Sequence, residues 1–391
     1  MSAALDTAAG ADRFRIFGAP RRYVQGAGAL DDLGRYAESL GRRATVLMDS
    51  RVQALFADRV GAALEAAGLP ARMVVHDGEV MPAQLQPLGS GLGLERSEVV
   101  IGVGGGKVLD SAKFLAAAAA APLVLAPTLG SSDAPTSRVI VLYDAAHRLT
   151  GLDFLRWNPD VVLVDTGVLV RAPQRYFVSG IGDAIAKMFE AEASARWSLP
   201  SFFAARPSLA ARCLAEESYA VIRRHGAAAV AAVAAQRPDP AFEDVVEATV
   251  LLSGLSFENG GLFLAHSMTR GFAMLPQTQA CLHGELVAFG LLVQLMQERR
   301  PTPLLLELLD FYARIGLPNC LAAIGLDGVD DAGLHSLAAA TLEAPYMRCL
   351  TGQLAAQELV ALIRALDTLS LRSGHAVTEP VWRRANAAAG G

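Results

Sequence analysis

The sequence predicts an α/β protein: an N-terminal Rossmann-like domain with a mostly parallel sheet, followed by an all-helical C-terminal domain. Up to about residue 170, short apolar runs rich in Val, Ile and Leu alternate with amphipathic segments. Such runs are typical of strands in a parallel sheet that is covered by helices on both faces. Beyond residue 173 these runs disappear, and helical segments are separated by Gly and Pro signals. We therefore expect a first domain over residues 1–170 and a second over residues 171–391.

The strands of the first domain are expected at its continuous apolar, β-branched runs. One of these runs leads directly into a glycine cluster, and amphipathic segments follow two of them, at 52–67 and 108–119. Because strands and helices alternate, we expect the strands to pair in one mostly parallel sheet. The expected strands are 44–48, 71–75, 98–103, 123–126, 139–143 and 160–165.

Composition and charge exclude several classes of protein. The chain has 391 residues, of which 52% are hydrophobic, enough for two separate cores. Its net charge of -5 argues against a nucleic-acid partner. The apolar stretch 114–127 is too short to cross a bilayer, and the N-terminus carries acids and no basic, apolar leader. The four cysteines are far apart, so we expect reduced thiols in a cytoplasmic protein.

A glycine cluster, Gly102–Lys107, lies between an expected strand and an expected helix. Glycines let the backbone approach a pyrophosphate, and a helix N-terminus offers unpaired N–H groups. The spacing matches neither the Rossmann fingerprint nor a Walker loop, and a simple connecting turn is the alternative. Asp49, where the first strand ends, could accept the adenosine ribose hydroxyls and repel a 2′-phosphate, which would favour NAD. Its position alone favours the other interpretation, a cap of the following helix.

A second polar loop follows the strand expected at 123–126. It contains Thr128 and Ser131, and Asp133 is the only charged residue before it ends at Ser137. Loops at strand ends are where sheets of this kind bind ligands. The alternative role for Asp133 is to brace its own loop through backbone N–H groups.

Three side chains in the middle of the chain form a candidate metal site: Asp183, His266 and His283. One carboxylate oxygen and two imidazole nitrogens leave a fourth position open on a tetrahedral ion, as in catalytic sites. Singly, each residue has another interpretation. Asp183 could be a first-turn charge of the helix through 188–190, His266 a hydrogen-bonded core histidine, and His283 a cap of the helix beginning near 284. A metal together with a dinucleotide indicates alcohol oxidation.

Taken in order, these motifs resemble the glycerol dehydrogenase family, within the iron-containing (group III) alcohol dehydrogenase superfamily. The resemblance rests on the ligand trio, on the glycine loop continued to Lys113, and on the polar loop, and it extends from about residue 17 to residue 290. It implies a dehydroquinate synthase-like fold in which NAD and a metal ion lie in a deep cleft between the dinucleotide-binding and helical domains. It also implies a homo-oligomer, for which the net charge and the short apolar stretch described above predict no nucleic-acid or membrane partner.

The resemblance also implies roles for individual residues. Asp183, His266 and His283 would bind zinc, because the third metal histidine of the iron-type relatives is not found here; iron(II) is the alternative. Asp133 and His266 would contact the substrate as catalytic residues. Relatives often carry a second histidine where this chain has Thr269, and this departure leaves the proton relay open. The residues that would bind NAD are Asp49, Gly105, Gly106, Lys107, Thr128, Ser131, Ser137, Val139 and Tyr143.

The activity that the resemblance implies is NAD-dependent oxidation of a vicinal diol, with glycerol to dihydroxyacetone as the nearest model, or the reverse reduction. A first alternative keeps the fold and the cofactor but acts on a 2-oxo acid or on another polyol or ketone. A second is a cyclising lyase similar to dehydroquinate synthase, which would need several Arg and Lys residues where the cleft motifs offer mainly Lys107 and Lys187. The intact ligand trio argues against a third, a non-catalytic NAD-binding protein.

Overall fold

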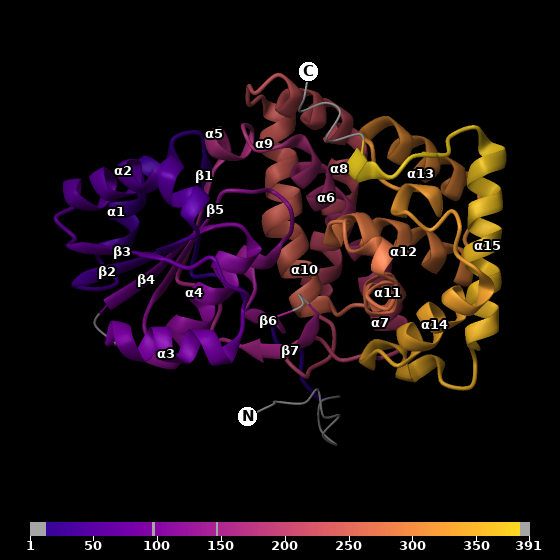
Figure 1. Ribbon diagram of the computed structural model, residues 1–391, viewed down its shortest axis with the longest axis horizontal. Coiled ribbons are helices and arrows are strands. Elements are labelled where there is room, and N and C mark those ends of the chain that lie inside the picture. The colour runs from indigo at the N-terminus through magenta and orange to yellow at the C-terminus, as the bar shows by residue number, and fades with distance from the viewer. Residues whose placement is uncertain (1–12, 96–97, 146–147, 384–391) are drawn as a thin grey trace.

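The computed structural model describes residues 13–95, 98–145 and 148–383; the N-terminal segment discussed above lies outside them. A sheet with helices on both faces lies beside a group of packed helices (Figure 1). In the described part of the chain, strands occur only up to residue 165, and the remainder is helical. The predicted architecture, a parallel α/β sheet followed by an all-helical part, is confirmed.

The strands are β1 (Arg22–Gly26), β2 (Arg43–Met48), β3 (Ala71–Val75), β4 (Glu98–Gly104), β5 (Leu123–Pro127), β6 (Val139–Tyr143), β7 (Leu149–Phe154) and β8 (Val161–Asp165). The helices between them are α1 (Leu33–Ala37), α2 (Ser50–Ala66), α3 (Pro82–Leu92) and α4 (Gly106–Ala119). The second half contains α5 (Thr166–Leu169), α6 (Gln174–Ala184), α7 (Lys187–Arg196), α8 (Leu209–Ala234), α9 (Pro240–Val246), α10 (Ser253–Gly260), α11 (Leu264–Phe272), α12 (His283–Gln297), α13 (Thr302–Ile315), α14 (Asp331–Leu342) and α15 (Ala356–Ser373). A π-helical segment, Glu247–Leu252, joins α9 to α10.

Six strands form the main sheet in the order β1-β8-β5-β4-β2-β3, and every neighbouring pair is parallel. The central strands β4 and β5 are buried along their whole length, which explains their uninterrupted apolar sequence. Alternate residues of β4 face opposite cores: Ile101 packs with α1 and α2, and Val100 with α3 and α4. Five of the six predicted strands are confirmed in this sheet, each end within one residue.

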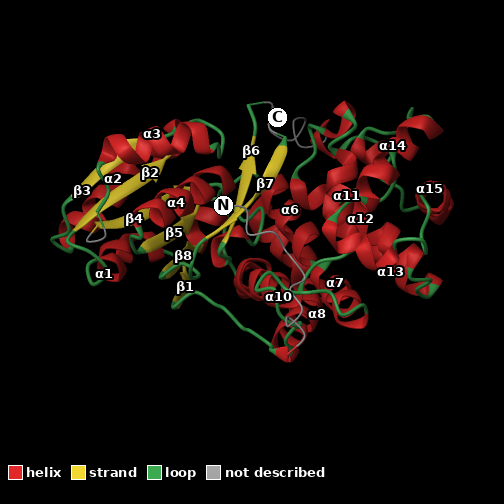
Figure 2. Cartoon of the chain, turned by 90° about the horizontal axis from the view of Figure 1, so that it is seen from below, coloured by secondary structure: helices red, strands yellow, loops and turns green. Residues whose placement is uncertain are grey.

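The prediction for 139–143 is wrong in one respect: these residues form β6, but β6 does not join the parallel sheet. It pairs antiparallel with β7, and the ribbon lies between the main sheet and the helices (Figure 2). Val141 N donates to Asp110 Oδ2, and Lys113 Nζ donates to Val139 O. Side chains of α4 therefore form hydrogen bonds with backbone N–H and C=O groups of β6 that could otherwise pair with a neighbouring strand. The sequence gives little sign of β1 because this partly exposed edge strand lacks a continuous apolar run.

The topology brings the predicted cofactor segments to one edge of the sheet. The chain passes from β2 to β3 on one side and then to β4 on the other, so a switch point lies between β2 and β4. Open α/β sheets bind ligands in the crevice at such points, outside the carboxyl ends of the strands. Asp49 follows β2, Gly105 follows β4, and the N–H of Thr128 after β5 donates to Gly104 O at 3.0 Å. The three segments are therefore neighbours.

In the described residues, no single helix is long and apolar enough to cross a membrane. Two helical segments, Pro240–Gly260 and Leu264–Phe272, meet at a bend of 95°. Together they would be long and apolar enough to cross a membrane, judged by length and composition alone.

Buried polar contacts of α10 tie the two halves together. The Glu258 carboxylate accepts hydrogen bonds from Arg138 N at 2.9 Å and from Asn158 Nδ2. The Asn259 side chain bonds to both the N–H and the carbonyl oxygen of Gly18. Burial raises the pKa of Glu258 to about 7, although these hydrogen bonds and the Arg138 charge oppose the shift. The junction between the halves therefore carries a carboxyl group that is costly to ionise.

We expect Glu258→Gln to change how stability depends on pH. The folded-state pKa lies above the ordinary value of 4.5, so the contribution of this group is present below about pH 4.5 and is lost as the pH rises through about 7. Glutamine does not ionise. The free energy of unfolding of the variant, relative to that of the wild type, should therefore rise by about 1–3 kcal/mol between pH 5 and pH 8. Urea unfolding at both pH values measures this, and a constant difference would contradict it.

Candidate active site

Two helices of the second half approach each other backbone to backbone, and this contact places two of the candidate metal ligands. Asp183 lies in the last turn of α6, and His283 is the first residue of α12. A Cβ on Gly182 would lie 2.5 Å from the carbonyl oxygen of Gly284. A Cβ on Gly284 would overlap the carbonyl oxygen of Ser179. A larger residue at either position would force the helices apart. The two glycines therefore set the separation of Asp183 and His283.

The structure brings the three predicted metal ligands together. One ligand atom from each of Asp183, His266 and His283 lies within 4.8 Å of the others. His266 Nε2 is 3.1 Å and His283 Nε2 is 3.9 Å from Asp183 Oδ1. Asp183 is buried, whereas the His283 side chain is 51% exposed, so the cluster borders solvent on the His283 side. One carboxylate oxygen and two imidazole nitrogens at this spacing fit a divalent zinc or iron ion that keeps an open coordination position.

The structure corrects two of the alternative interpretations. Asp183 is not in the first turn of the helix through 188–190, because that helix, α7, begins only at Lys187. Asp183 lies instead at the carbonyl end of α6, where the helix dipole disfavours a negative charge, so nearby cations must compensate it. His283 does not cap α12, whose N-cap residue is Leu282. His266 is a buried, hydrogen-bonded histidine, as the alternative supposed, but its partners belong to this cluster.

Glu190 on α7 holds His266 in position. Its Oε2 lies 2.5 Å from His266 Nδ1, and its Oε1 accepts from the backbone N–H groups of Phe263 and His266. A carboxylate beside Nδ1 places the ring proton there and leaves the lone pair on Nε2, which faces Asp183. Burial works to raise the pKa of Glu190, but His266 and Lys187 lower it overall, so this carboxylate is charged.

Lys187 is the cation of the cluster. Its buried Nζ lies 2.6 Å from Asp183 Oδ1, 3.0 Å from His266 Nε2 and 3.2 Å from Asp133 Oδ2. Burial works to lower the pKa of Lys187, but the surrounding carboxylates raise it overall. Burial works to raise the pKa of Asp183, but this ammonium together with His266 and His283 holds the pKa of that carboxyl well below its usual range. Lys187 thus supplies the compensation that Asp183 needs at the end of α6.

Asp133 lies against this ammonium and not against its own loop. Its Oδ2 accepts a hydrogen bond from Ser253 Oγ at 2.6 Å and pairs with Lys187. The partners of this carboxylate therefore lie on α10 and α7. This argues against the alternative that Asp133 stabilises its own loop by accepting hydrogen bonds from the N–H groups of that loop. Burial raises the pKa of Asp133, and the nearby charge of Asp183 adds to the shift.

The polar loop after β5 runs from the cofactor edge of the sheet to this cluster. Thr128 bonds to Gly104 at the edge, the Ser131 carbonyl accepts a hydrogen bond from Ser179 Oγ on α6 at 3.5 Å, and Asp133 then reaches Lys187. One short loop thus borders both the predicted cofactor segments and the predicted metal ligands. The other residues implied to line the nicotinamide side follow it, in the turn before β6 and on β6 itself: Ser137, Val139 and Tyr143.

The glycine loop joins β4 to α4 as predicted, with Gly105 as the N-cap residue of α4. A Cβ on Gly104 would lie 2.7 Å from the Val108 side chain, so this glycine is needed for packing the helix on the strand. A Cβ on Gly106 would meet nothing within 4 Å. Gly106 therefore borders open space at the N-terminus of α4, where unpaired N–H groups favour an anion.

The two charged residues predicted at the cofactor edge already have partners. Asp49 Oδ1 accepts a hydrogen bond from Val52 N at 2.7 Å, so Asp49 caps α2, the role that its position favoured. A capping carboxylate keeps its second oxygen, which could accept a ribose hydroxyl. Lys107 is half exposed and forms an ion pair with Glu79.

Sequence reasoning missed two residues that contact the cluster. It gave no role to Glu190 or Ser253, and it named Lys187 only as a cation of the cleft. A signal for the first was present: Asp183, Lys187 and Glu190 are spaced as i, i+4 and i+7, which would place them on one face of a helix. Nothing in the sequence connects Ser253 to Asp133, because they are 120 residues apart.

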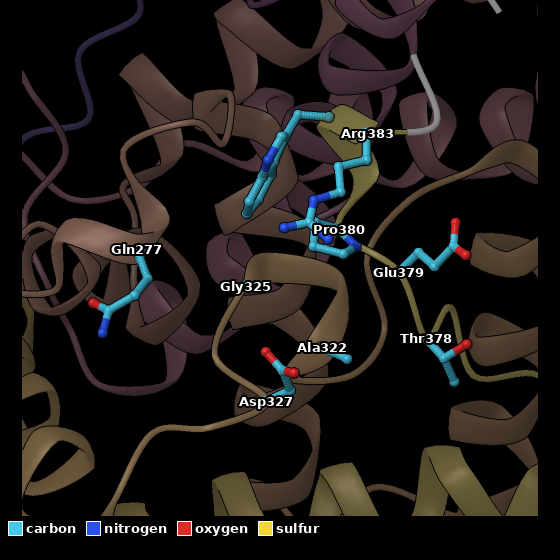
Figure 3. Close-up of a pocket in the computed structure, with 9 residues that line it drawn as sticks. Gln277, Ala322, Gly325, Asp327, Thr378, Glu379, Pro380 and Arg383 are labelled. Atoms are coloured by element: carbon cyan, nitrogen blue, oxygen red, sulfur yellow. The ribbon is translucent and has the colours of Figure 1, made fainter. Parts of the chain in front are cut away.

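A separate pocket lies between a turn after α13 and the C-terminal segment (Figure 3). None of the predicted site residues lines it. The pocket is lined by Gln277, Ala322, Gly325, Asp327, Thr378, Glu379, Pro380, Trp382 and Arg383.

Comparison with known proteins identifies the family of the chain. Residues 20–166 match the family described as iron-containing alcohol dehydrogenase. A glycerol dehydrogenase of Thermotoga maritima is 40% identical over 82% of this chain and 87% of its own. A glycolaldehyde reductase of Halobacterium salinarum is 37% identical over 84% of this chain and 90% of its own. The crystal structure of glycerol dehydrogenase from Schizosaccharomyces pombe superposes with a TM-score of 0.88 at 34% identity and covers 92% of each chain.

The chain therefore belongs to the iron-containing alcohol dehydrogenase family. It is an alcohol dehydrogenase that acts on small molecules, and its membership implies NAD and a divalent metal ion as cofactors. The donor set of Asp183, His266 and His283 fits such an ion.

We expect Gly284→Ala to separate the metal ligands. The new methyl group would overlap Ser179 O, so α6 and α12 must move apart, which should cost about 2–4 kcal/mol of stability. The affinity for Zn²⁺, measured by competition with a chromophoric chelator, should fall at least about tenfold. Gly91→Ala is the control, because a Cβ there meets nothing within 4 Å. A folded Gly284→Ala protein with unchanged zinc affinity would contradict this account of the contact.

Proposed function

We propose that this chain catalyses the NAD-dependent oxidation of a vicinal diol at a zinc ion, with glycerol to dihydroxyacetone as the model reaction, or the reverse reduction. The observation that carries the proposal is the convergence of Asp183, His266 and His283 with Asp133, at the end of a loop that starts at the cofactor edge. Relatives named glycerol dehydrogenase, 34–40% identical over 82–91% of this chain, support a diol as substrate.

In this proposal, Asp183, His266 and His283 hold the ion, which when bound supplies a Lewis acid that lowers the pKa of the reacting hydroxyl group. Glu190 keeps the lone pair of His266 directed into the cluster. Thr269 stands where the family resemblance implies a second histidine. Its hydroxyl donates to His266 O at 2.7 Å, so its proton is directed to its own helix and not to the cluster.

Asp133 is proposed to bind the second hydroxyl of the diol. Ser253 and Lys187 both contact its Oδ2, which leaves Oδ1 for a substrate hydroxyl. Such an acceptor favours a diol over a simple alcohol that has no polar group on the neighbouring carbon. At the other end of the loop, Gly105 and Gly106 would admit the pyrophosphate to the N-terminus of α4.

We further propose that residues 1–170 form the cofactor domain and residues 171–391 the metal domain of a cytoplasmic homo-oligomer. The compartment rests on the four cysteines, all of which lie in the described residues and none of which forms a disulfide, as expected in a reducing environment. Analytical ultracentrifugation would give the subunit count.

The proposed function is tested by measuring NAD⁺ reduction with a series of diols, simple alcohols and 2-hydroxy acids, with and without added Zn²⁺. We expect Asp183→Asn to lower zinc affinity at least about a hundredfold and to abolish diol oxidation, because a three-ligand site loses its only anionic ligand. Chelation should inactivate the wild type reversibly. Asp310→Asn, an exposed surface change, is the control. Full turnover by protein shown to be metal-free would overturn the metal mechanism.

We expect Asp49→Gly to relax the preference for NAD. The change removes a negative charge and a hydroxyl acceptor at the end of β2, so kcat/KM for NADP relative to NAD should rise by on the order of tenfold. Glycine is tolerated at an N-cap, so stability should change by only a few tenths of a kcal/mol. Asp239→Gly, which removes the equivalent cap of α9, controls for the helix effect. An unchanged ratio would mean that Asp49 serves only as a cap.

A further inference from the structure

Lys187 occupies the junction between the proposed metal and substrate positions. An ammonium group has three N–H donors and no acceptor. Here three groups lie within 3.2 Å of Nζ: the metal ligands Asp183 and His266, and the substrate-facing Asp133. The Phe257 ring, 5.3 Å from Nζ, lies against the same group. The lysine therefore contacts both parts of the site at once.

The contact with His266 is incompatible with a bound metal ion. His266 Nδ1 carries a proton that faces Glu190, so Nε2 has the one free lone pair of the ring. Lys187 donates to that lone pair in this structure, and a metal ion needs the same lone pair to bind His266. The ammonium must therefore release His266 when an ion binds. Asp133, which is not among the metal ligands, is the partner that it can keep.

The charges of the buried cluster show what Lys187 adds. Three carboxylates, from Asp133, Asp183 and Glu190, surround it, and all three are buried. A divalent ion together with the ammonium balances them. Without Lys187 the loaded site would carry a net negative charge and would repel an anionic substrate.

The chain also uses lysine sparingly. Only three of its 34 basic residues are lysines, at 107, 113 and 187, and the other 31 are arginines. A compact ammonium fits among three acceptors within 3.2 Å, whereas a planar guanidinium presents five donors in a fixed fork. A lysine at 187 thus supplies a compact point charge that fits among these acceptors.

We propose that Lys187 determines specificity at this site: with the metal bound, its ammonium moves onto Asp133 and lets the enzyme accept a carboxylate next to the reacting carbon. The site would then interconvert 2-hydroxy acids and 2-oxo acids as well as diols. This inference rests on the proposed dehydrogenase function and extends its substrate class. The N–H group that His266 gives up becomes available to a carboxylate oxygen of the substrate.

The reaction on such a substrate balances without any further reactant. The carbinol carbon loses its hydrogen as hydride to NAD⁺, the hydroxyl group loses its proton to solvent, and the C–O bond becomes a carbonyl. The carboxylate is unchanged, so it serves only for recognition. Lys187 takes no part in the bond changes and acts through charge and hydrogen bonding.

The test compares two substrates that differ at one carbon, 1,2-propanediol and lactate, with zinc-loaded enzyme and NAD⁺. Lys187→Met keeps the length of the side chain and removes its charge. We expect it to lower kcat/KM for lactate by about thirtyfold more than for 1,2-propanediol. Arg196→Met, which removes a half-exposed charge from the same helix, should leave the ratio unchanged. Equal losses on both substrates, or no lactate oxidation by a wild type that oxidises the diol, would overturn the inference.

A second measurement does not depend on turnover. Because the ammonium and the ion compete for His266, Lys187→Met should bind Zn²⁺ at least about tenfold more tightly than the wild type in a chelator competition. Unchanged affinity would refute the displacement. If Lys187→Met does not fold, Lys187→Gln is used in its place for both the substrate comparison and the zinc-affinity measurement. A wild type that oxidises lactate but no diol would refute the diol proposal and leave the role of Lys187 standing.

Discussion

The close contact between α6 and α12 is the constraint on which the site depends. Gly182 and Gly284 let the two backbones touch, and Asp183 and His283 stand next to them in the chain. Packed interiors do not deform continuously, so a contact of this kind sets ligand positions more firmly than a loop could. His266 comes from a third helix, α11, and its ring is fixed separately by Glu190. The geometry of the cluster thus follows from packing between helices and not from any local motif.

Electrostatics imposes a second requirement on the same place. Burying three carboxylates in one small volume is costly unless cations and hydrogen bonds accompany them. Glu190 has His266 and two backbone N–H groups, and Asp133 has Ser253. Asp183 has Lys187 and the histidines, and it lies at the disfavoured end of a helix. The site is therefore built to receive positive charge, which suits a divalent ion in the family to which the chain belongs.

Much of the fold was predictable because burial on both faces leaves a plain mark on a sequence. β4 and β5 show it as uninterrupted apolar runs. The placement of β6 was not predictable, since its own sequence resembles that of a buried strand. Its hydrogen bonds to Asp110 and Lys113 depend on how α4 lies beside it. β1 lies at the sheet edge, where partial exposure removes the continuous apolar run.

The sequence by itself determined which chemical groups are available: a glycine loop before a helix, an acid after the first strand, and three residues whose types match a catalytic metal site. It determined the family as well, because several independent motifs occur in one order. Only the tertiary structure decided that these groups meet. Asp133 and Ser253 are 120 residues apart, and Lys187 and His266 are 79 apart. Distances between such residues are set by helix packing across the core, and no periodicity or spacing along the chain records that packing.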